Sequence, residues 1–451
     1  MVIRSVTFYT ISNYINIFLS FIQGFFLVKM LSLQQMGEFS QFKIILNYLL
    51  LFNFGLTNSF LILLPKVSDK EKEIYKNKIF TINSLIFLVI SLFLSLLVLF
   101  LKKEIFLFLS LTLFFYSAKE IPLYYLKSTG DFSKYSINLV LSQIILLVLT
   151  IVLTYFFGLN GAYISFIFYS LLSFAVGVMF TKGIRFETFN FENLLFFLRK
   201  GFSIYFVGLL NQIISSFERL FLSFILIKET FAIYSTAVFF LSFVQMLPVS
   251  IVQYFLPDFV KNIDKYSCKR LNFFFITISV LTFFFITVSY VFLKIVTGKF
   301  LTNYVESVNI FLILSITIFF DIFFYIMFNK LLSIEKLKYY NYLQIAGSLL
   351  ILSGVLIFYI FEKKIDIVKF SYYFLTLKTL YFFIWILLSK FILKAKILNL
   401  FSLATVLLFS LLIFSFEKLN LNLLIGIIIF ICFIFIFEGK KLVLWMRKNL
   451  N

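Results

Sequence analysis

Residues 79–101 read IFTINSLIFLVISLFLSLLVLFL and contain no charged side chain between Lys78 and Lys102. A stretch of about 20 apolar residues can cross the hydrocarbon core of a bilayer as a helix, so this segment predicts such a span. The pattern repeats along the 451 residues of the chain, of which 62% are apolar and 13% are charged. An ordinary globular chain is about 45–50% apolar. The composition therefore indicates an all-α polytopic membrane protein and excludes soluble, disordered and disulfide-stabilised folds.

Apolar windows bounded by charges predict about fourteen transmembrane helices. Six lie near residues 12–31, 39–64, 79–101, 105–126, 135–157 and 159–181; after a more polar linker at 182–200, six more lie near 201–227, 231–257, 271–293, 305–329, 340–361 and 367–389, and two shorter ones near 397–416 and 421–437. The predicted domains are an N-terminal six-helix lobe at 1–185, a C-terminal six-helix lobe at 186–393, and two additional helices with a cytoplasmic tail at 394–451. Weak similarity between the two six-helix blocks predicts that the lobes are related by a pseudo-two-fold repeat.

The lysines and arginines of the predicted loops are distributed unevenly. Assigned to alternate sides of the fourteen spans, 26 fall on one side and 9 on the other. Cytoplasmic loops carry the excess of positive charge, so we expect both termini in the cytoplasm. The formal net charge of +20 follows from this topology, and no nucleic-acid binding is expected.

Residue types that carry catalysis or bind metals are scarce in the chain. It has no histidine and only two cysteines, Cys268 and Cys432, which lie far apart in the sequence. Histidine is the commonest general base and metal ligand, so triad chemistry and a metal site are not expected. No predicted loop leaves room for a soluble catalytic domain. The sequence therefore predicts a protein that is not an enzyme and that carries no metal or other cofactor.

Eight charged residues fall inside predicted spans, where a charge at the helix centre costs about 2.5–3.5 kcal/mol on insertion scales and marks a candidate functional residue. They are five cations and three acids: Lys29, Lys43, Lys119, Arg219, Lys378, Glu120, Glu218 and Asp321. The surplus of two cations favours an anionic substrate. The planar guanidinium of Arg219 suits the oxygens of a diphosphate, and Lys29, Lys43 and Lys378 are candidates for the same substrate site. In the alternative interpretation, Lys29 and Lys43 reach the membrane interface, while Glu218 and Arg219 neutralise other partners.

The remaining intramembrane charges are candidates for ion coupling or for structural charge pairs. Lys119 and Glu120 precede Pro122, and Asp321 lies at a comparable depth in the span that the repeat pairs with theirs. Two such carboxylates are compatible with a Na⁺ or H⁺ site, and equally with a structural ion pair between one of them and Lys119. Lys378 has no acidic neighbour on its own helix, so it requires a cavity or an acid from another span.

The chain resembles the polysaccharide flippase family, the translocases of O-antigen and capsule repeat units within the multidrug/oligosaccharidyl-lipid/polysaccharide exporter superfamily. The resemblance covers most of the first 390 residues and is carried by LQQMGEFS at 33–40, FGLTNS at 54–59, GLNGAYIS at 158–165, FER at 217–219, IYSTA at 233–237 and YFLP at 254–257. Two features depart from the family pattern: Glu218 stands where the family usually has aspartate, and the second Gly-Ala turn is replaced by EKKID at 362–366.

The resemblance implies two six-helix lobes around a central cavity in a bacterial inner membrane. It also implies alternating access that moves a polyprenyl-diphosphate-linked oligosaccharide from the cytoplasmic to the outer leaflet of the bilayer, with a glycan polymerase or ligase as a partner in the same pathway. The motifs do not separate this family from lipid II flippases or cation-coupled multidrug exporters, so these stay alternatives. A membrane glycan polymerase or ligase is a further alternative, although the predicted outward loops are short.

Overall fold

The computed structural model describes residues 2–261, 268–333, 337–362, 365–393 and 400–416. Within these ranges the backbone is helical with short connections and holds no strand. Ten of the described helices are long and apolar enough to cross a membrane, and a bent helix pair raises the number to eleven if it forms one span. The all-α polytopic membrane fold predicted from the composition is thus confirmed.

The chain divides into two compact units, Met1–Ala232 and Ile233–Asn451, and each is described by itself. Unit 1 holds more of the chain than the predicted first lobe, because it includes the helix that follows the polar linker. The predicted limits at 185 and 393, and the count of fourteen spans, stay predictions. The last predicted span at 421–437, Cys432 and the predicted tail lie outside the described residues.

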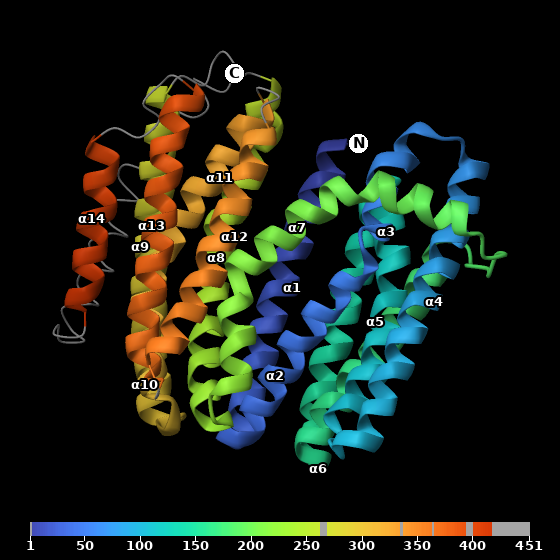
Figure 1. Ribbon diagram of the computed structural model, residues 1–451, viewed down its shortest axis with the longest axis horizontal. Coiled ribbons are helices and arrows are strands. Elements are labelled where there is room, and N and C mark those ends of the chain that lie inside the picture. Colours follow the sequence, from blue (N-terminus) through green and yellow to red (C-terminus); the bar gives the residue numbers. More distant parts are fainter. Residues whose placement is uncertain (1, 262–267, 334–336, 363–364, 394–399, 417–451) are drawn as a thin grey trace. The chain divides into compact units, whose positions relative to one another are not determined.

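Unit 1 is a bundle whose long helices lie side by side (Figure 1). Its elements are α1 (Val2–Met30), α2 (Leu33–Leu49), η1 (Leu50–Asn53), α3 (Leu56–Leu63), η2 (Leu64–Lys66), α4 (Asp69–Leu101), α5 (Ile105–Ser128), α6 (Phe132–Phe180) and α7 (Phe191–Ile225). Helix α5 packs between α4 and α6, and α1 packs on α6. A capping box at Ser68, whose side chain accepts from the Glu71 amide, begins α4, the helix that contains the long apolar run.

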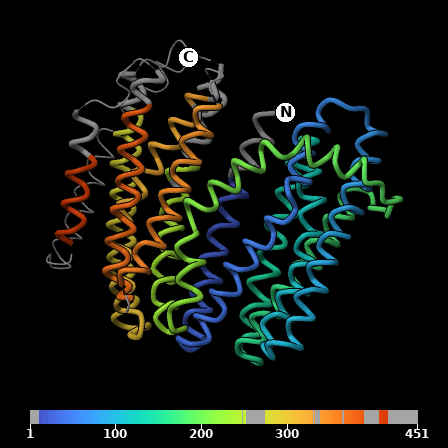
Figure 2. The backbone as a smooth tube through the Cα atoms, viewed as in Figure 1, coloured from blue at the N-terminus to red at the C-terminus, as the bar shows by residue number. Residues whose placement is uncertain are grey.

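Helix α6 contains two of the predicted spans and reverses at Gly158 (Figure 2). Gly158 has φ 57° and ψ −133°, a conformation that glycine adopts without steric cost. A side chain on Gly161 would overlap the carbonyl oxygen of Leu153, so the second half of α6 approaches the first at backbone distance. The predicted turn between residues 157 and 159 is confirmed.

The span predicted near 39–64 is not one continuous helix, and this part of the prediction is wrong. The chain bends by 55° between α2–η1 and α3–η2. Phe54 and Gly55 take left-handed conformations with φ 47° and 90°, and the Gly55 amide donates to Asn53 Oδ1 at 2.8 Å. The hydropathy of 39–64 continues across this break, so the apolar run by itself gave no sign of it.

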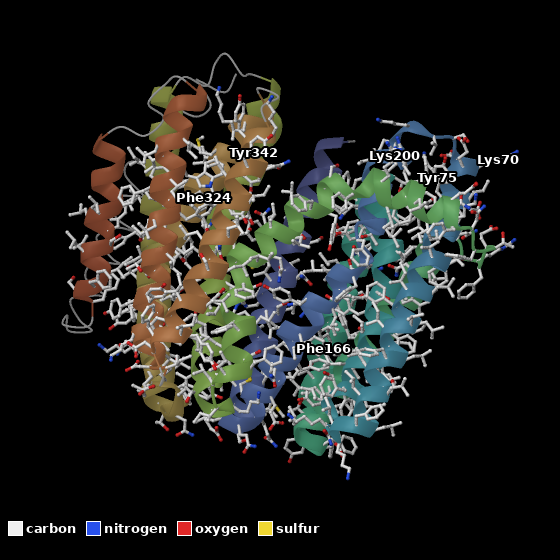
Figure 3. All side chains as sticks on the ribbon, viewed as in Figure 1. Lys70, Tyr75, Phe166, Lys200, Phe324 and Tyr342 are labelled. Carbon is white, nitrogen blue, oxygen red and sulfur yellow. The ribbon has the colours of Figure 1, made fainter. Side chains whose placement is uncertain are left out.

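Short α3 packs against α7, the helix that begins inside the predicted linker. Asn190 accepts a hydrogen bond from the Glu192 amide at 2.7 Å and starts α7 ten residues before the predicted span. Lys70 and Lys200 lie at the same end of unit 1 (Figure 3), which agrees with their assignment to one side of the membrane.

Unit 2 is a second helical bundle with an aromatic core. After α8 (Lys228–Lys261), whose first turns belong to unit 1, it contains α9 (Cys268–Lys299), η4 (Thr302–Tyr304), α10 (Glu306–Ser315), α11 (Thr317–Ser333), α12 (Leu337–Phe361), α13 (Ile367–Leu393) and α14 (Leu400–Ser415). Helices α10 and α11 together form the span predicted near 305–329. The rings of Phe320 and Phe382 stack at 4.7 Å and fix α11 on α13.

Candidate functional site

A cavity of about 390 Å³, lined by polar and apolar side chains, lies inside unit 1. Elements η1, α3, α4, α5 and α7 supply its walls: Leu50, Leu51, Asn53, Thr57, Asn58, Asn83, Phe87, Tyr116, Ser117, Glu120, Tyr124, Ile204, Tyr205, Gly208, Leu209 and Gln212. Ligand pockets typically measure about 300–1,000 Å³, so the cavity is large enough for a small ligand group. The break at Gly55 helps to build it, because it brings α3 against α7.

Glu120 enters this cavity from α5, and Lys119 beside it points into the protein. The Lys119 ammonium donates to the Tyr169 hydroxyl at 3.0 Å and lies 3.6 Å from the Tyr116 ring centroid and 4.4 Å from that of Tyr169. Its distance to Glu120 Oε1 is 3.6 Å, and its side chain is 3% exposed against 28% for Glu120. Lys119 is therefore enclosed by tyrosines, while the Glu120 carboxylate borders the cavity.

A second set of charged residues lies on α2 and α7 and consists of Lys43, Glu218 and Arg219; we name it the α2–α7 cluster. Arg219 Nε lies 3.7 Å from Glu218 Oε1, a long ion pair in which Glu218 is 4% exposed and Arg219 31%. Lys43 and Arg219 are close enough to interact electrostatically. The Lys43 ammonium also lies 5.9 Å from the ring centroids of Phe39 and Phe166, the second of which is labelled in Figure 3. The cluster has a formal charge of +1.

Residues on one face of α7 connect the cavity to the α2–α7 cluster. Gln212, which lines the cavity, donates to Ser216 Oγ at 2.9 Å, and Ser216 Oγ lies 3.3 Å from the hydroxyl of Tyr48 on α2. Arg219 comes two turns after Gln212, which corresponds to about 10 Å along the helix. The two sites therefore share a wall.

Unit 2 holds two further predicted site residues, Asp321 and Lys378. Gln245 on α8 donates to Asp321 Oδ2 on α11 at 2.7 Å. Lys378 on α13 is 5% exposed, lies 5.6 Å from the Phe374 ring centroid and interacts electrostatically with Asp321. Asp321, on another helix, is thus an acid with which Lys378 interacts. The sequence left open whether Glu120 and Asp321 form one Na⁺ or H⁺ site together. In the structure, Glu120 belongs to unit 1 and Asp321 to unit 2.

Lys29 lies exposed in the last turn of α1, where a cation is favoured by the helix dipole. Within the described residues it makes no ion pair, whereas Lys119 and Arg219 each pair with an acid. The described part of the chain also holds no group of three His, Cys, Asp or Glu residues that is arranged to bind a metal ion.

Several residues of these sites were missed by reasoning from charge alone. Tyr169 and Gln245 form hydrogen bonds to the predicted charges Lys119 and Asp321, and Tyr48 accepts a hydrogen bond from Ser216. The neutral amides and hydroxyls of the cavity line it together with Glu120. A usable signal was present in the sequence, because Asn53, Asn58 and Gln212 interrupt apolar spans where a polar side chain needs a partner.

Solved structures of membrane transporters share this fold. A structure described as lipid II flippase MurJ in an inward closed conformation matches with a TM-score of 0.72 and 18% identity, covering 96% of this chain and 99% of that chain. An inward-facing multidrug resistance MATE family transporter of the MOP superfamily matches with a TM-score of 0.66 and 11% identity over 84% of this chain and 94% of its own. An outward-facing transporter of the same description gives 0.56 and 12% over 87% and 95%.

No protein-family model matches the chain, and no curated protein matches it by sequence. The identities of 11–18% establish the fold alone. The chain therefore has the multi-pass fold shared by a lipid flippase and multidrug transporters of the MOP superfamily. The narrower resemblance to polysaccharide flippases stays a prediction.

Proposed function

We propose that this protein is a flippase that moves a polyprenyl-diphosphate-linked oligosaccharide, an O-antigen or capsule repeat unit, from the cytoplasmic to the outer leaflet of a bacterial inner membrane. The observation that carries the proposal is the α2–α7 cluster, in which Lys43 and Arg219 interact electrostatically and Arg219 lies on α7, a helix that also lines the cavity. The fold shared with a lipid II flippase over 96% of the chain adds support.

The proposed roles follow from the chemistry of each group. The guanidinium of Arg219 offers paired N–H donors to diphosphate oxygens, and Lys43 adds a second positive charge. Glu218 holds Arg219 in place through the long ion pair. The polyprenyl chain stays in the lipid, so no free energy is needed to remove it from the bilayer. Alternating access then moves the head group without forming or breaking a covalent bond, so no cofactor is required. Lys29 and Lys378 are additional candidates for contacts with the anionic substrate.

Ion coupling belongs to the same proposal. The Asp321 carboxylate, with Gln245 and Lys378 around it, and the Glu120 carboxylate beside Lys119 are the candidate sites for Na⁺ or H⁺. In both, the carboxylate has a cationic partner within the same unit, so binding of a cation would compete with that partner. A coupling ion would thus change the position of Lys378 or Lys119.

Export of cationic drugs is the second candidate function, and one observation favours it: the charged residue that lines the cavity is an acid. Drug export requires the cavity to bind cations. Flipping of a lipid-linked glycan requires the α2–α7 cluster to bind a diphosphate, so the two functions depend on different residues.

The test is the leaflet distribution of lipid-linked glycan in a strain that lacks this protein, measured with a membrane-impermeant reagent. Build-up of an intact repeat unit on the cytoplasmic leaflet is the expected result, and build-up of lipid II there would instead assign the lipid II alternative. Normal glycan export with increased sensitivity to cationic drugs would refute the proposal in favour of drug export. Single repeat units left on the outer leaflet would indicate a polymerase or ligase.

Variants of α7 test the role of the α2–α7 cluster. Arg219→Ala is expected to abolish complementation, because it removes the guanidinium fork, and Arg219→Lys to restore it only in part, because an ammonium keeps the charge without the fork. Arg199→Ala is the matched control, since Arg199 is an exposed arginine of the same helix. Normal export by Arg219→Ala at normal membrane abundance would remove Arg219 from the site.

A further inference from the structure

The cavity of unit 1 and the α2–α7 cluster differ in charge. Of the sixteen residues that line the cavity, Glu120 is the single charged one, and the others are neutral polar or apolar. Lys119, the nearest cation on α5, is turned toward Tyr169 and is 3% exposed. A phosphate group in this cavity would face a carboxylate, so the cavity and the cluster are suited to different parts of a ligand.

The Glu120 carboxylate has unused hydrogen-bonding capacity. An ionised carboxylate accepts at about four lone-pair positions. Its ion-pair partner Lys119 is 3.6 Å away, and within the described residues no donor forms a hydrogen bond to it. Asn58, across the cavity on α3, likewise makes no side-chain hydrogen bond among the described residues, although its amide can donate twice and accept. A ligand rich in donors and acceptors would satisfy both groups.

Aromatic rings complete the lining. Tyr116 and Tyr124 lie on the same face of α5 as Glu120, four residues before and after it, and Tyr205 borders the cavity from α7. Rings beside a carboxylate and an amide form a surface on which the C–H face of a sugar ring can pack while its hydroxyl groups bind the polar side chains. A volume of about 390 Å³ accommodates one or two sugar rings but not a whole oligosaccharide.

We propose that this cavity is a sugar subsite that holds the glycan residue nearest the diphosphate, and that it selects an uncharged or N-acetylated sugar over a carboxylated one. The inference rests on the proposed function, because it takes the diphosphate to lie at the α2–α7 cluster. The helix positions of Gln212 and Arg219 are about 10 Å apart along α7. The Arg219 side chain extends back toward Ser215, so it and a bound diphosphate can span this separation and leave the attached sugar in the cavity. Glu120 accepts hydrogen bonds from the sugar, and Asn58 binds its hydroxyl or acetamido group.

This assignment changes an expectation derived from composition. The surplus of intramembrane cations favoured an anionic substrate in general, whereas Glu120 repels a sugar carboxylate in the described cavity. Acidic sugars, where the glycan contains them, would have to occupy positions farther from the diphosphate.

The experiment measures binding of two matched probes to the purified full-length protein in lipid nanodiscs: farnesyl-diphosphate-linked N-acetylglucosamine and farnesyl-diphosphate-linked glucuronic acid. The wild-type protein is expected to bind the first probe at least about 10-fold more tightly. Glu120→Gln is expected to reduce this preference to about 3-fold or less, since a neutral amide no longer repels the acid. Arg219→Ala is expected to weaken both probes equally and leave the preference unchanged.

A second variant keeps the test valid if Glu120→Gln misfolds, since that substitution leaves Lys119 without its acid. Asn58→Ala is expected to weaken the N-acetylglucosamine probe about 10-fold, while farnesyl diphosphate without a sugar binds as it does to the wild type. Probes that bind equally well to the wild type, or an unchanged preference in both cavity variants, would overturn the sugar subsite and leave the flippase proposal standing. Absence of binding by farnesyl diphosphate and both glycosylated probes would overturn the flippase proposal itself.

Discussion

Replacement of Gly201 by alanine tests the close approach of α3 and α7 that forms the cavity. A Cβ atom on Gly201 would overlap the carbonyl oxygen of Gly55 and lie 2.9 Å from the Ser59 amide nitrogen. Both neighbours are backbone atoms, which cannot rotate away, so the two helices would have to separate by about the width of the overlap. Overpacking of this kind costs about 1–3 kcal/mol, and we expect the upper part of that range.

Thermal unfolding measures this cost. For a unit of about 150–250 residues, 1 kcal/mol shifts Tm by about 2–4 °C, so Gly201→Ala is expected to lower Tm by about 5–10 °C. Membrane proteins often unfold irreversibly, so both proteins are scanned at one rate in one detergent. Gly208→Ala is the matched control for stability, since a Cβ there meets no atom within 4 Å. Its Tm is expected to stay the same or rise slightly, because alanine is the better helix former.

A Tm for Gly201→Ala within about 2 °C of the wild type would refute the close approach of α3 and α7. A lowered Tm with normal transport would show that the contact stabilises unit 1 without shaping the cavity. A lowered Tm together with loss of transport is expected, because α3 carries Thr57 and Asn58 and α7 carries Tyr205, and all three residues line the cavity.

Three further substitutions probe the frame of unit 1, each by thermal unfolding. Lys76 is 1% exposed, and its ammonium donates to the Thr181 and Gly183 carbonyls at 2.8 and 2.7 Å. Lys76→Met removes both hydrogen bonds and is expected to lower the free energy of unfolding by about 2 kcal/mol. The control Lys70→Met, at an exposed position, should change it by less than about 0.5 kcal/mol. Gly161→Ala should destabilise the reversal of α6 by about 1–3 kcal/mol, and equal stability would argue against the close approach to Leu153. Tyr169→Phe removes the acceptor of the Lys119 hydrogen bond and should lower the free energy of unfolding by about 1–3 kcal/mol. An unchanged free energy would show that the contacts with the rings are sufficient to hold the ammonium.

The sequence predicted the fold well because a membrane span leaves a direct trace in hydropathy. The turn at residue 158 was predicted from the limits of two apolar runs and from the GLNGAYIS motif at 158–165, and the structure has a positive φ at Gly158. The break at Gly55 was missed, although FGLTNS was noticed, because the residues on both sides are equally apolar. A change in helix direction depends on backbone conformation and on contact with α7, neither of which alters the hydropathy of a window.

The candidate sites were predictable in their charges but not in their pairings. A buried charge is costly in any span, so Lys119, Glu120 and Asp321 stood out from sequence alone. Which of them meet depends on how helices pack, and Gln245 was found beside Asp321 only in the structure. Neutral lining residues such as Asn58 carry a smaller cost in a membrane and therefore leave a weaker trace.

The pairings also explain where an anion can bind. Lys119 with Glu120 and Arg219 with Glu218 form ion pairs inside unit 1, and Lys378 interacts electrostatically with Asp321 inside unit 2. The surplus of two intramembrane cations counted from the sequence is therefore Lys29 and Lys43. Lys43 lies close enough to Arg219 to interact with it, so the α2–α7 cluster keeps a net positive charge while the other two pairs are neutral. If the protein is the proposed flippase, its preference for an anionic head group depends on the α2–α7 cluster rather than on the average charge of the spans. Because the adjoining cavity contains a carboxylate, a ligand that is negative at one end and neutral at the other fits this unit better than a uniformly acidic one.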